Sequence, residues 1–235
     1  MKFITVAGPP SSGKTLVIIH LIKLLQADGI QAVVGKIDCH ETADGTIFKE
    51  RLGIPVVVGR SDYVCPDHYG AVNAEEIFRF GKNHDADITI VETAGLCHRC
   101  APAIKGCLAI AVVDNVSGID TPRKIGPMLT TADIVVITKG DMVSQAEREV
   151  FRDNVLEVNP EAKAIEMNGL TGMGALNLKR LVQDAPEIDM LTGRELRHDM
   201  PSAVCSYCEG ETKIGSDYQM GNVIKMDIKE VLDAN

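Results

Sequence analysis

The chain has 235 residues, 45% of them hydrophobic, and a formal net charge of −9 from 24 basic and 33 acidic residues. This composition is typical of a globular protein and excludes collagen-like and disordered chains. The negative charge disfavours nucleic acid as a partner, and neither a run of about 18 apolar residues nor a signal peptide is present, so we expect a cytoplasmic protein without a membrane span.

Short runs rich in valine and isoleucine recur along the chain, with segments of helical spacing between them. The runs are typical of strands buried on both faces of a parallel sheet, and lie at residues 3–7, 32–34, 55–58, 88–91, 108–113 and 134–137. Helices are expected at residues 14–27, 74–82, 144–158 and 175–183. This alternation predicts an α/β fold with a doubly wound, mostly parallel sheet.

The first strand leads into a phosphate-binding loop. The motif G-x-x-x-x-G-K-[ST] is matched by Gly8, Pro9, Pro10, Ser11, Ser12, Gly13, Lys14 and Thr15. Glycines permit a tight loop whose backbone N–H groups converge on phosphate oxygens, and the following helix adds a favourable dipole. Lys14 is expected to hold the β- and γ-phosphates, and the Thr15 hydroxyl to ligate Mg²⁺. The sequence therefore predicts a P-loop nucleotide-binding protein.

Acidic residues end two further strands. Glu92, which Gly95 follows closely, comes at the end of one buried strand, and Asp38 closes the second strand. Glu92 is a candidate to hold a Mg²⁺-bound water, and Gly95 lets the backbone approach the γ-phosphate. Asp38 is a candidate either for Mg²⁺ or for orienting the attacking water. Both acids could instead be solvated strand ends.

A later strand is followed by Thr138-Lys139-Gly140-Asp141. The Asp141 carboxylate can accept hydrogen bonds from the two donors of guanine, which adenine lacks, and the Lys139 stem can cover the base. An ordinary loop in which Asp141 caps a helix is the alternative.

Six of the seven cysteines lie near another potential metal ligand, although a lone C-x-x-C pair can also be structural or incidental. Cys65 and His68 lie three apart in a segment expected to be a loop, and two C-x-x-C pairs are formed by Cys97 with Cys100 and by Cys205 with Cys208. In the cytosol such pairs hold Zn²⁺, another transition metal or an iron–sulfur cluster more often than disulfides. Cys107 begins an apolar run and is expected in the core.

Taken together, these motifs resemble the SIMIBI class of P-loop GTPases, and within it the nickel-insertion GTPases that mature hydrogenase and urease. The motif order matches over roughly residues 1–182, and the segment of Asn168, Gly169 and Leu170 resembles the loop that closes over guanine in that family. The resemblance implies Mg²⁺-dependent GTP hydrolysis to GDP, a homodimer and a metal site near the dimer interface. Thr138 departs from the asparagine of the nickel GTPases, so ATP stays open.

We therefore expect a GTPase domain at residues 1–185 and a short cysteine-containing extension at residues 186–235, with a strand at 222–228. The expected function is a metallochaperone that inserts a metal, nickel in the first instance, into a client enzyme, with Lys14 and Asp38 as catalytic residues. Two alternatives remain: an ATP-dependent activator or kinase on the same fold, and a non-catalytic metal or iron–sulfur scaffold with bound nucleotide.

Overall fold

A computed structural model describes residues 1–39, 43–95, 102–198, 212–219, 221 and 223–228. Its centre is a seven-stranded sheet in the order β3-β2-β4-β1-β5-β6-β7, and every pairing in it is parallel. The strands are β1 (Lys2–Ala7), β2 (Ala32–Asp38), β3 (Val56–Arg60), β4 (Ile88–Glu92), β5 (Leu108–Asp114), β6 (Ile134–Thr138) and β7 (Lys163–Glu166). The prediction of a doubly wound parallel sheet is confirmed.

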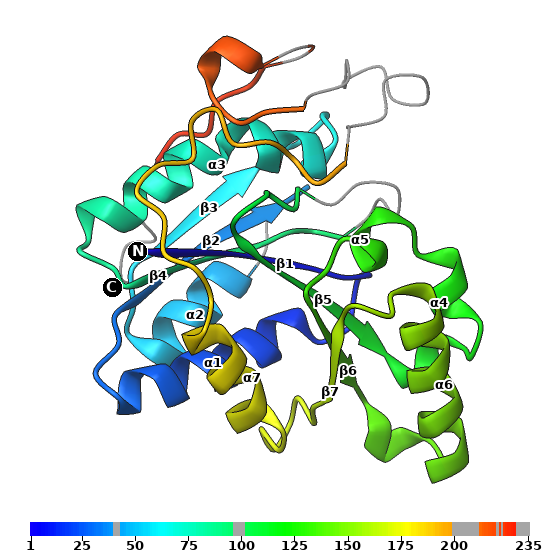
Figure 1. Ribbon diagram of the computed structural model, residues 1–235. Helices are drawn as coiled ribbons and strands as arrows, with labels where there is room; N and C mark the ends of the chain where they lie inside the picture. The colour runs from blue at the N-terminus through cyan, green and yellow to red at the C-terminus, as the bar shows by residue number, and fades with distance from the viewer. Residues whose placement is uncertain (40–42, 96–101, 199–211, 220, 222, 229–235) are drawn as a thin grey trace.

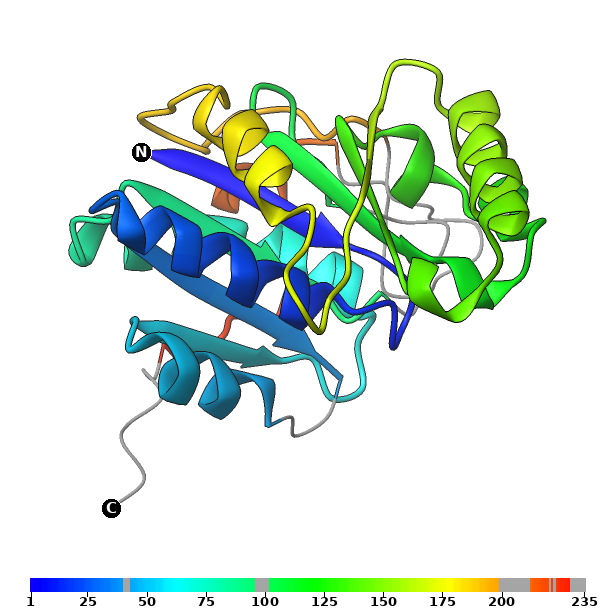
Figure 2. The same ribbon diagram turned by 90° about the horizontal axis from the view of Figure 1, so that it is seen from below.

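Helices cover both faces of the sheet. One face carries α1 (Lys14–Ala27), α2 (Asp44–Leu52) and α7 (Ala175–Gln183), which lie on the near side of the sheet in Figure 2. The other face carries α3 (Pro66–Asn83), α5 (Pro127–Thr130) and α6 (Gln145–Val158), with α4 (Thr121–Lys124) against α6. Short 3₁₀ turns are formed by Asn115–Ser117, Gly140–Met142 and Ser216–Tyr218. Within the described parts of the chain, every helix is too short or too polar to cross a lipid bilayer.

Alternation along each strand separates two layers of core. In β1, Ile4 and Val6 pack against α1, α2 and α7, whereas Phe3 and Ala7 face the opposite layer. Because both faces are covered, the inner strands are mostly apolar and could be found from their composition. The parallel register brings the carboxyl ends of the strands to one edge of the sheet, where ligands bind in folds of this type.

Several elements differ from the sequence prediction. Helix α2 and strand β7 were not predicted, because α2 buries only Gly45, Phe48 and Leu52 and the edge strand β7 buries only Ile165. Helix α3 begins at Pro66 rather than at residue 74, since proline is well suited to a first helical position. The strand expected at 222–228 is wrong for residues 223–228, which form no strand.

The described part of the extension packs on the domain. Ile188, Leu191, Leu196 and Ile214 are buried in the same apolar cluster as Phe3. The chain then runs along α3 (Figure 1). There Asn73 of α3 donates to the Ile224 carbonyl, 2.9 Å, and accepts from the Met226 N–H, 2.8 Å. The extension therefore contributes to the core on the α3 side of the sheet, and the boundary at residue 186 stays a prediction.

Candidate functional site

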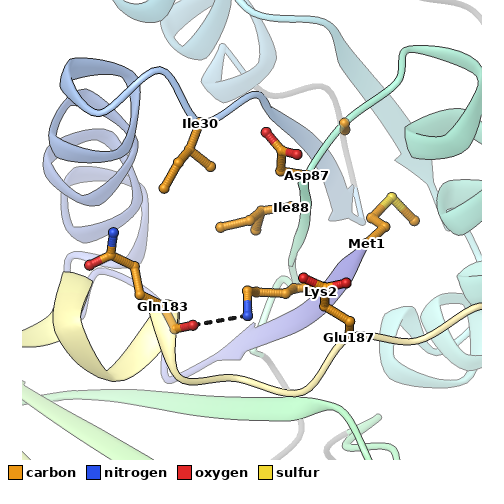
Figure 3. A pocket seen from close by; sticks show the side chains of 8 residues that line it. Met1, Lys2, Ile30, Asp87, Ile88, Gln183 and Glu187 are labelled. Carbon is orange, nitrogen blue, oxygen red and sulfur yellow. Dashed lines mark hydrogen bonds between the residues drawn. The ribbon is translucent and has the colours of Figure 1, made fainter.

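The end of the sheet where the strands begin differs from the end where they finish in the residues that line it. A hollow of about 440 Å³ lies at the edge where β1 and β4 begin, and Figure 3 shows Lys2 beside it donating to the Gln183 carbonyl at 2.9 Å. None of the residues predicted to bind nucleotide lines this hollow. They gather instead where the strands end, which is the edge at which a parallel sheet binds ligands.

The segment between β1 and α1 forms the cradle that the motif predicts. Gly13 adopts a left-handed conformation, φ 94°, immediately before α1. A Cβ atom on Gly8 would lie 2.2 Å from the Val112 carbonyl oxygen, so only glycine fits there. The buried Ser12 hydroxyl has no hydrogen-bond partner among the described residues. An unsatisfied buried donor beside a glycine-lined loop fits a phosphate ligand.

Lys14 lies folded against this loop. Its ammonium donates to the carbonyl oxygens of Gly8, 2.9 Å, and Pro9, 3.0 Å. Burial lowers the pKa of Lys14, and the nearby Glu92 carboxylate opposes that effect. A buried ammonium held by two backbone carbonyls is well placed to exchange them for phosphate oxygens.

The loop after β4 contacts the phosphate loop directly. Gly95 has φ 73°, and a Cβ atom at this position would lie 1.6 Å from the Gly8 carbonyl oxygen and 3.3 Å from the Lys14 Nζ. The preceding Thr93 donates its backbone N–H to Val6 of β1, 3.0 Å. The two loops predicted to touch the nucleotide are thus in backbone contact, and Gly95 is required for that contact.

Thr15 and Glu92 converge beside the cradle. The Thr15 hydroxyl donates to the Glu92 carboxylate, with its Oγ1 3.0 Å and 3.2 Å from the two oxygens. Glu92 is buried, and burial raises its pKa against the lowering effect of nearby lysines. A hydroxyl and a carboxylate next to a phosphate site are hard oxygen donors of the kind that Mg²⁺ takes, together with water and substrate oxygens. The residues present therefore fit a Mg²⁺ ion.

Lys36 of β2 is the functional residue that the sequence analysis missed. Its ammonium lies 2.8 Å from Glu92 Oε1, 2.9 Å from Asp44 Oδ2 and 3.4 Å from Asp38 Oδ2. Burial opposes the charge, yet Glu92 and Asp44 outweigh it and raise the pKa of Lys36 above its ordinary value. The available signal was a lysine inside an otherwise apolar strand, Ala-Val-Val-Gly-Lys-Ile-Asp.

Asp38 therefore lies in an ion-paired cluster rather than at a solvated strand end. Its second carboxylate oxygen accepts from the backbone N–H of Cys39, 2.8 Å. Its predicted role toward Mg²⁺ or the attacking water stays a prediction.

Thr138 joins the base-recognition motif to the phosphate loop. Its hydroxyl donates to the Ser12 carbonyl oxygen at 2.6 Å, and Asn115 donates to the Thr138 carbonyl oxygen at 2.8 Å. Both side chains are buried. The first residue of the motif thus positions the phosphate loop, and Asn115 is a supporting residue that local sequence did not reveal.

Asp141, which follows β6, contacts the segment after β7 at the carboxyl ends of these two strands. Asn168 donates to the Asp141 carboxylate at 3.0 Å and accepts from the backbone N–H groups of Leu170 and Thr171, both at 2.9 Å. His20 of α1 lies 3.0 Å from the Gly169 carbonyl oxygen. Exposed Asp141 and half-buried Asn168 therefore lie together, although they are 27 positions apart in sequence.

The remaining base-motif residue is Lys139, which has a left-handed backbone, φ 56°. Its ammonium lies 3.7 Å from Asp114 Oδ1 at the end of β5.

Cys65 and His68 were expected to lie in a loop, and this prediction is wrong. Both lie at the start of α3. Cys65 immediately precedes the helix, Pro66 opens it and His68 is buried in its first turn. Proline at the first helical position explains the difference. Between them, Asp67 is fully buried, and neither carboxylate oxygen has a hydrogen-bond partner among the described residues. Burial raises the pKa of Asp67 well above its usual range; nearby Cys65 adds to the rise, and Lys14 opposes it.

The other predicted metal ligands cannot be placed. Cys97, Cys100, Cys205 and Cys208 lie outside the described residues. Within the part that is described, no group of three or more His, Cys, Asp and Glu side chains is arranged to hold a metal ion. Cys107 is buried in the core, as predicted.

Comparisons with known proteins agree with this geometry. The family model described as CobW/HypB/UreG, nucleotide-binding domain, matches residues 2–166. An uncharacterized protein of Methanocaldococcus jannaschii is 50% identical over 227 residues, 97% of each chain. Urease accessory protein UreG of Haloquadratum walsbyi is 27% identical over 190 residues, 75% of this chain and 91% of that one.

Among solved structures, HypB from Helicobacter pylori in complex with nickel superposes with a TM-score of 0.66 at 19% identity, covering 80% of this chain and 91% of that one. This likeness concerns the fold. Because the family model spans more than half of the sequence, the chain belongs to the CobW/HypB/UreG family of nucleotide-binding domains.

Proposed function

We propose that this protein is a Mg²⁺-dependent GTPase that serves as a metallochaperone and delivers a transition metal, nickel in the first instance, to a client enzyme. The observation that carries the nucleotide part is the glycine-lined cradle with Lys14 at its mouth and the Thr15–Glu92 pair beside it. Every part of this arrangement lies at the ligand-binding edge of a parallel sheet.

The chain's own groups would act mainly by position and charge, as in other phosphoryl transfers. Lys14 leaves the carbonyl oxygens of Gly8 and Pro9 to hold phosphate oxygens. Thr15 and Glu92 would hold Mg²⁺, Glu92 through a water molecule; the ion neutralises charge that develops on the phosphates. Asp38, at the end of β2, orients the attacking water. Gly95 lets its loop approach the γ-phosphate.

Selection of guanine is assigned to Asp141, whose carboxylate can accept from the two donors on that base. Asn168 supports this choice because it holds the Asp141 carboxylate and shapes the segment of Gly169 and Leu170 beside it. Lys139 is assigned to the face of the base.

The metal part of the proposal rests on the cysteines and on the relatives. One structural neighbour is HypB in complex with nickel, and one sequence relative is a urease accessory protein. Cys97 and Cys100 follow Gly95 directly in sequence. Metal held there, or at Cys65 beside α3, would lie close in the chain to loops that respond to the γ-phosphate, which links release to nucleotide state. A homodimer that shares ligands between two copies is part of this proposal.

Two measurements test it. Fluorescent mant-GDP displaced by GTP and by ATP gives the base preference, and we expect GTP to compete at least about tenfold better because adenine lacks the donor pair. Elemental analysis of protein prepared with GDP and with a non-hydrolysable GTP analogue gives the metal content, which should differ between the two states.

A cysteine pair and its control sharpen the metal test. Replacing both Cys97 and Cys100 with serine should lower metal stoichiometry and leave mant-GDP binding unchanged. Cys107→Ala alters a buried core cysteine and should change neither. Equal metal content in all three proteins would exclude Cys97 and Cys100 as ligands, and equal competition by ATP and GTP would refute the assignment of Asp141.

A further inference from the structure

Lys36 occupies an unusual place for a lysine. It belongs to β2, which lies between the edge strand β3 and β4, and its side chain is only 3% exposed. Its ammonium contacts carboxylates from three elements: Glu92 of β4, Asp44 in the first turn of α2 and Asp38 at the end of its own strand. A buried ammonium is costly unless it is paired in this way. The position therefore needs an explanation beyond packing.

The ammonium also shares an acceptor with the residue predicted to bind Mg²⁺. Lys36 Nζ is 2.8 Å from Glu92 Oε1, and Thr15 Oγ1 is 3.0 Å from the same oxygen. Lys36 and its three carboxylates together carry a formal charge of −2, which the nearby Lys14 ammonium reduces to −1. Such a cluster attracts a divalent cation, and a water molecule on that ion would compete with Lys36 for the hydrogen bond to Glu92 Oε1.

We propose that Lys36 is a built-in counter-ion that holds Glu92 when Mg²⁺ is absent and competes with Mg²⁺ for it. Binding of Mg²⁺ with nucleotide requires the ammonium to withdraw from Glu92, because a Mg²⁺-bound water needs the same carboxylate and the two cations would repel each other at that short range. Lys36 keeps its ion pair with Asp44 when it withdraws from Glu92. Binding of Mg²⁺ therefore moves a charge that is paired with the first turn of α2. This inference rests on the proposed Mg²⁺–nucleotide site and assigns the residue that sets its Mg²⁺ requirement.

The test is a Mg²⁺ titration of mant-GDP binding to the full chain. Lys36→Met removes the competing charge and leaves Thr15 and Glu92 in place. The Mg²⁺ concentration for half-maximal retention of mant-GDP should fall at least about tenfold, since the ion no longer displaces an ammonium. Lys36→Arg keeps a positive charge and should stay close to the wild-type requirement.

Lys179→Met is the matched control. Lys179 of α7 is also largely buried and ion-paired, with Asp28 after α1, but it contributes nothing to the phosphate cradle. Its replacement should leave the Mg²⁺ requirement unchanged. A general effect of removing a lysine would shift both variants equally and would contradict the proposal.

A second measurement, of melting temperature, uses the protein without nucleotide. Lys36→Met leaves three carboxylates without their ammonium, so its melting temperature should be lower than that of the wild type in EDTA and should rise when Mg²⁺ is added. The wild type, whose cluster already holds a cation, should respond less. If Lys36→Met does not fold, Lys36→Gln, which keeps an N–H donor toward Glu92, takes its place in both arms.

The outcomes separate the two proposals. If no variant binds mant-GDP or mant-ATP, the proposed function fails, and the melting measurements still decide the role of Lys36. If mant-GDP binds with a Mg²⁺ requirement that is the same in wild type, Lys36→Met and Lys36→Gln, the competition is refuted and the nucleotide site stands.

Discussion

The phosphate end and the base end of the site are built in opposite ways. Around Lys14, Thr15, Glu92 and Lys36, charged and polar groups are buried and compensate one another at distances of 2.8–3.2 Å. At the other end, Asp141 is exposed and is held by a single side-chain hydrogen bond from Asn168. Changes at the phosphate end should therefore affect every nucleotide, whereas changes at the base end should affect the choice of base alone.

The largest expected effect is that of Gly95→Ala. The added Cβ would lie 1.6 Å from the Gly8 carbonyl oxygen, and the backbone has φ 73°, so the two loops must separate. We expect affinity for GDP and ADP alike to fall by about 100-fold or more, measured with mant-nucleotides. Gly29→Ala is the control, because Gly29 has φ 77° but nothing within 4 Å of an added Cβ. Normal nucleotide affinity of Gly95→Ala would show that the two loops need not touch.

Asp141→Asn should produce the next largest effect, and only on the base. The amide presents a donor where guanine needs a second acceptor, so GTP affinity should fall by about tenfold or more while xanthosine triphosphate gains. Competition of both against mant-GDP measures the exchange. Because Asp141 is exposed, the melting temperature should change little. An unchanged ratio of the two affinities would remove Asp141 from base recognition.

Thr138→Val tests the hydrogen bond that connects the base-recognition motif to the phosphate loop, and it should have the smallest effect of the three changes. It removes the hydroxyl that donates to the Ser12 carbonyl oxygen at 2.6 Å, within a buried environment. We expect a loss of about 1–2 kcal/mol in the free energy of unfolding and a similar, several-fold weakening for GTP and ATP. Thr131→Val, which removes a 2.6 Å bond to Pro127 away from the site, is the matched control. A weakening confined to GTP would instead place Thr138 in base recognition.

Parts of the site could be predicted from sequence because their chemistry is local. The phosphate loop is one continuous segment between a buried strand and a helix. The spacing of its glycines, Lys14 and Thr15 is therefore enough to recognise the motif. Glu92 and Asp141 could be nominated because each ends an apolar strand, and parallel strands end at a common edge. The cysteine pairs are equally visible as spacing, but Cys97, Cys100, Cys205 and Cys208 lie outside the described residues.

The sequence by itself determined the parallel sheet, the phosphate loop and the candidates for base recognition, because period, spacing and strand order are properties of neighbouring residues. Only the tertiary structure decided that Lys36 lies among Glu92, Asp44 and Asp38, and that Thr138 supports the phosphate loop through Ser12. These facts depend on contacts between segments far apart in the chain. Neighbouring carboxylates then set the ionic state of a buried side chain such as Lys36, and neither the burial nor the neighbours have a signature in the residue itself.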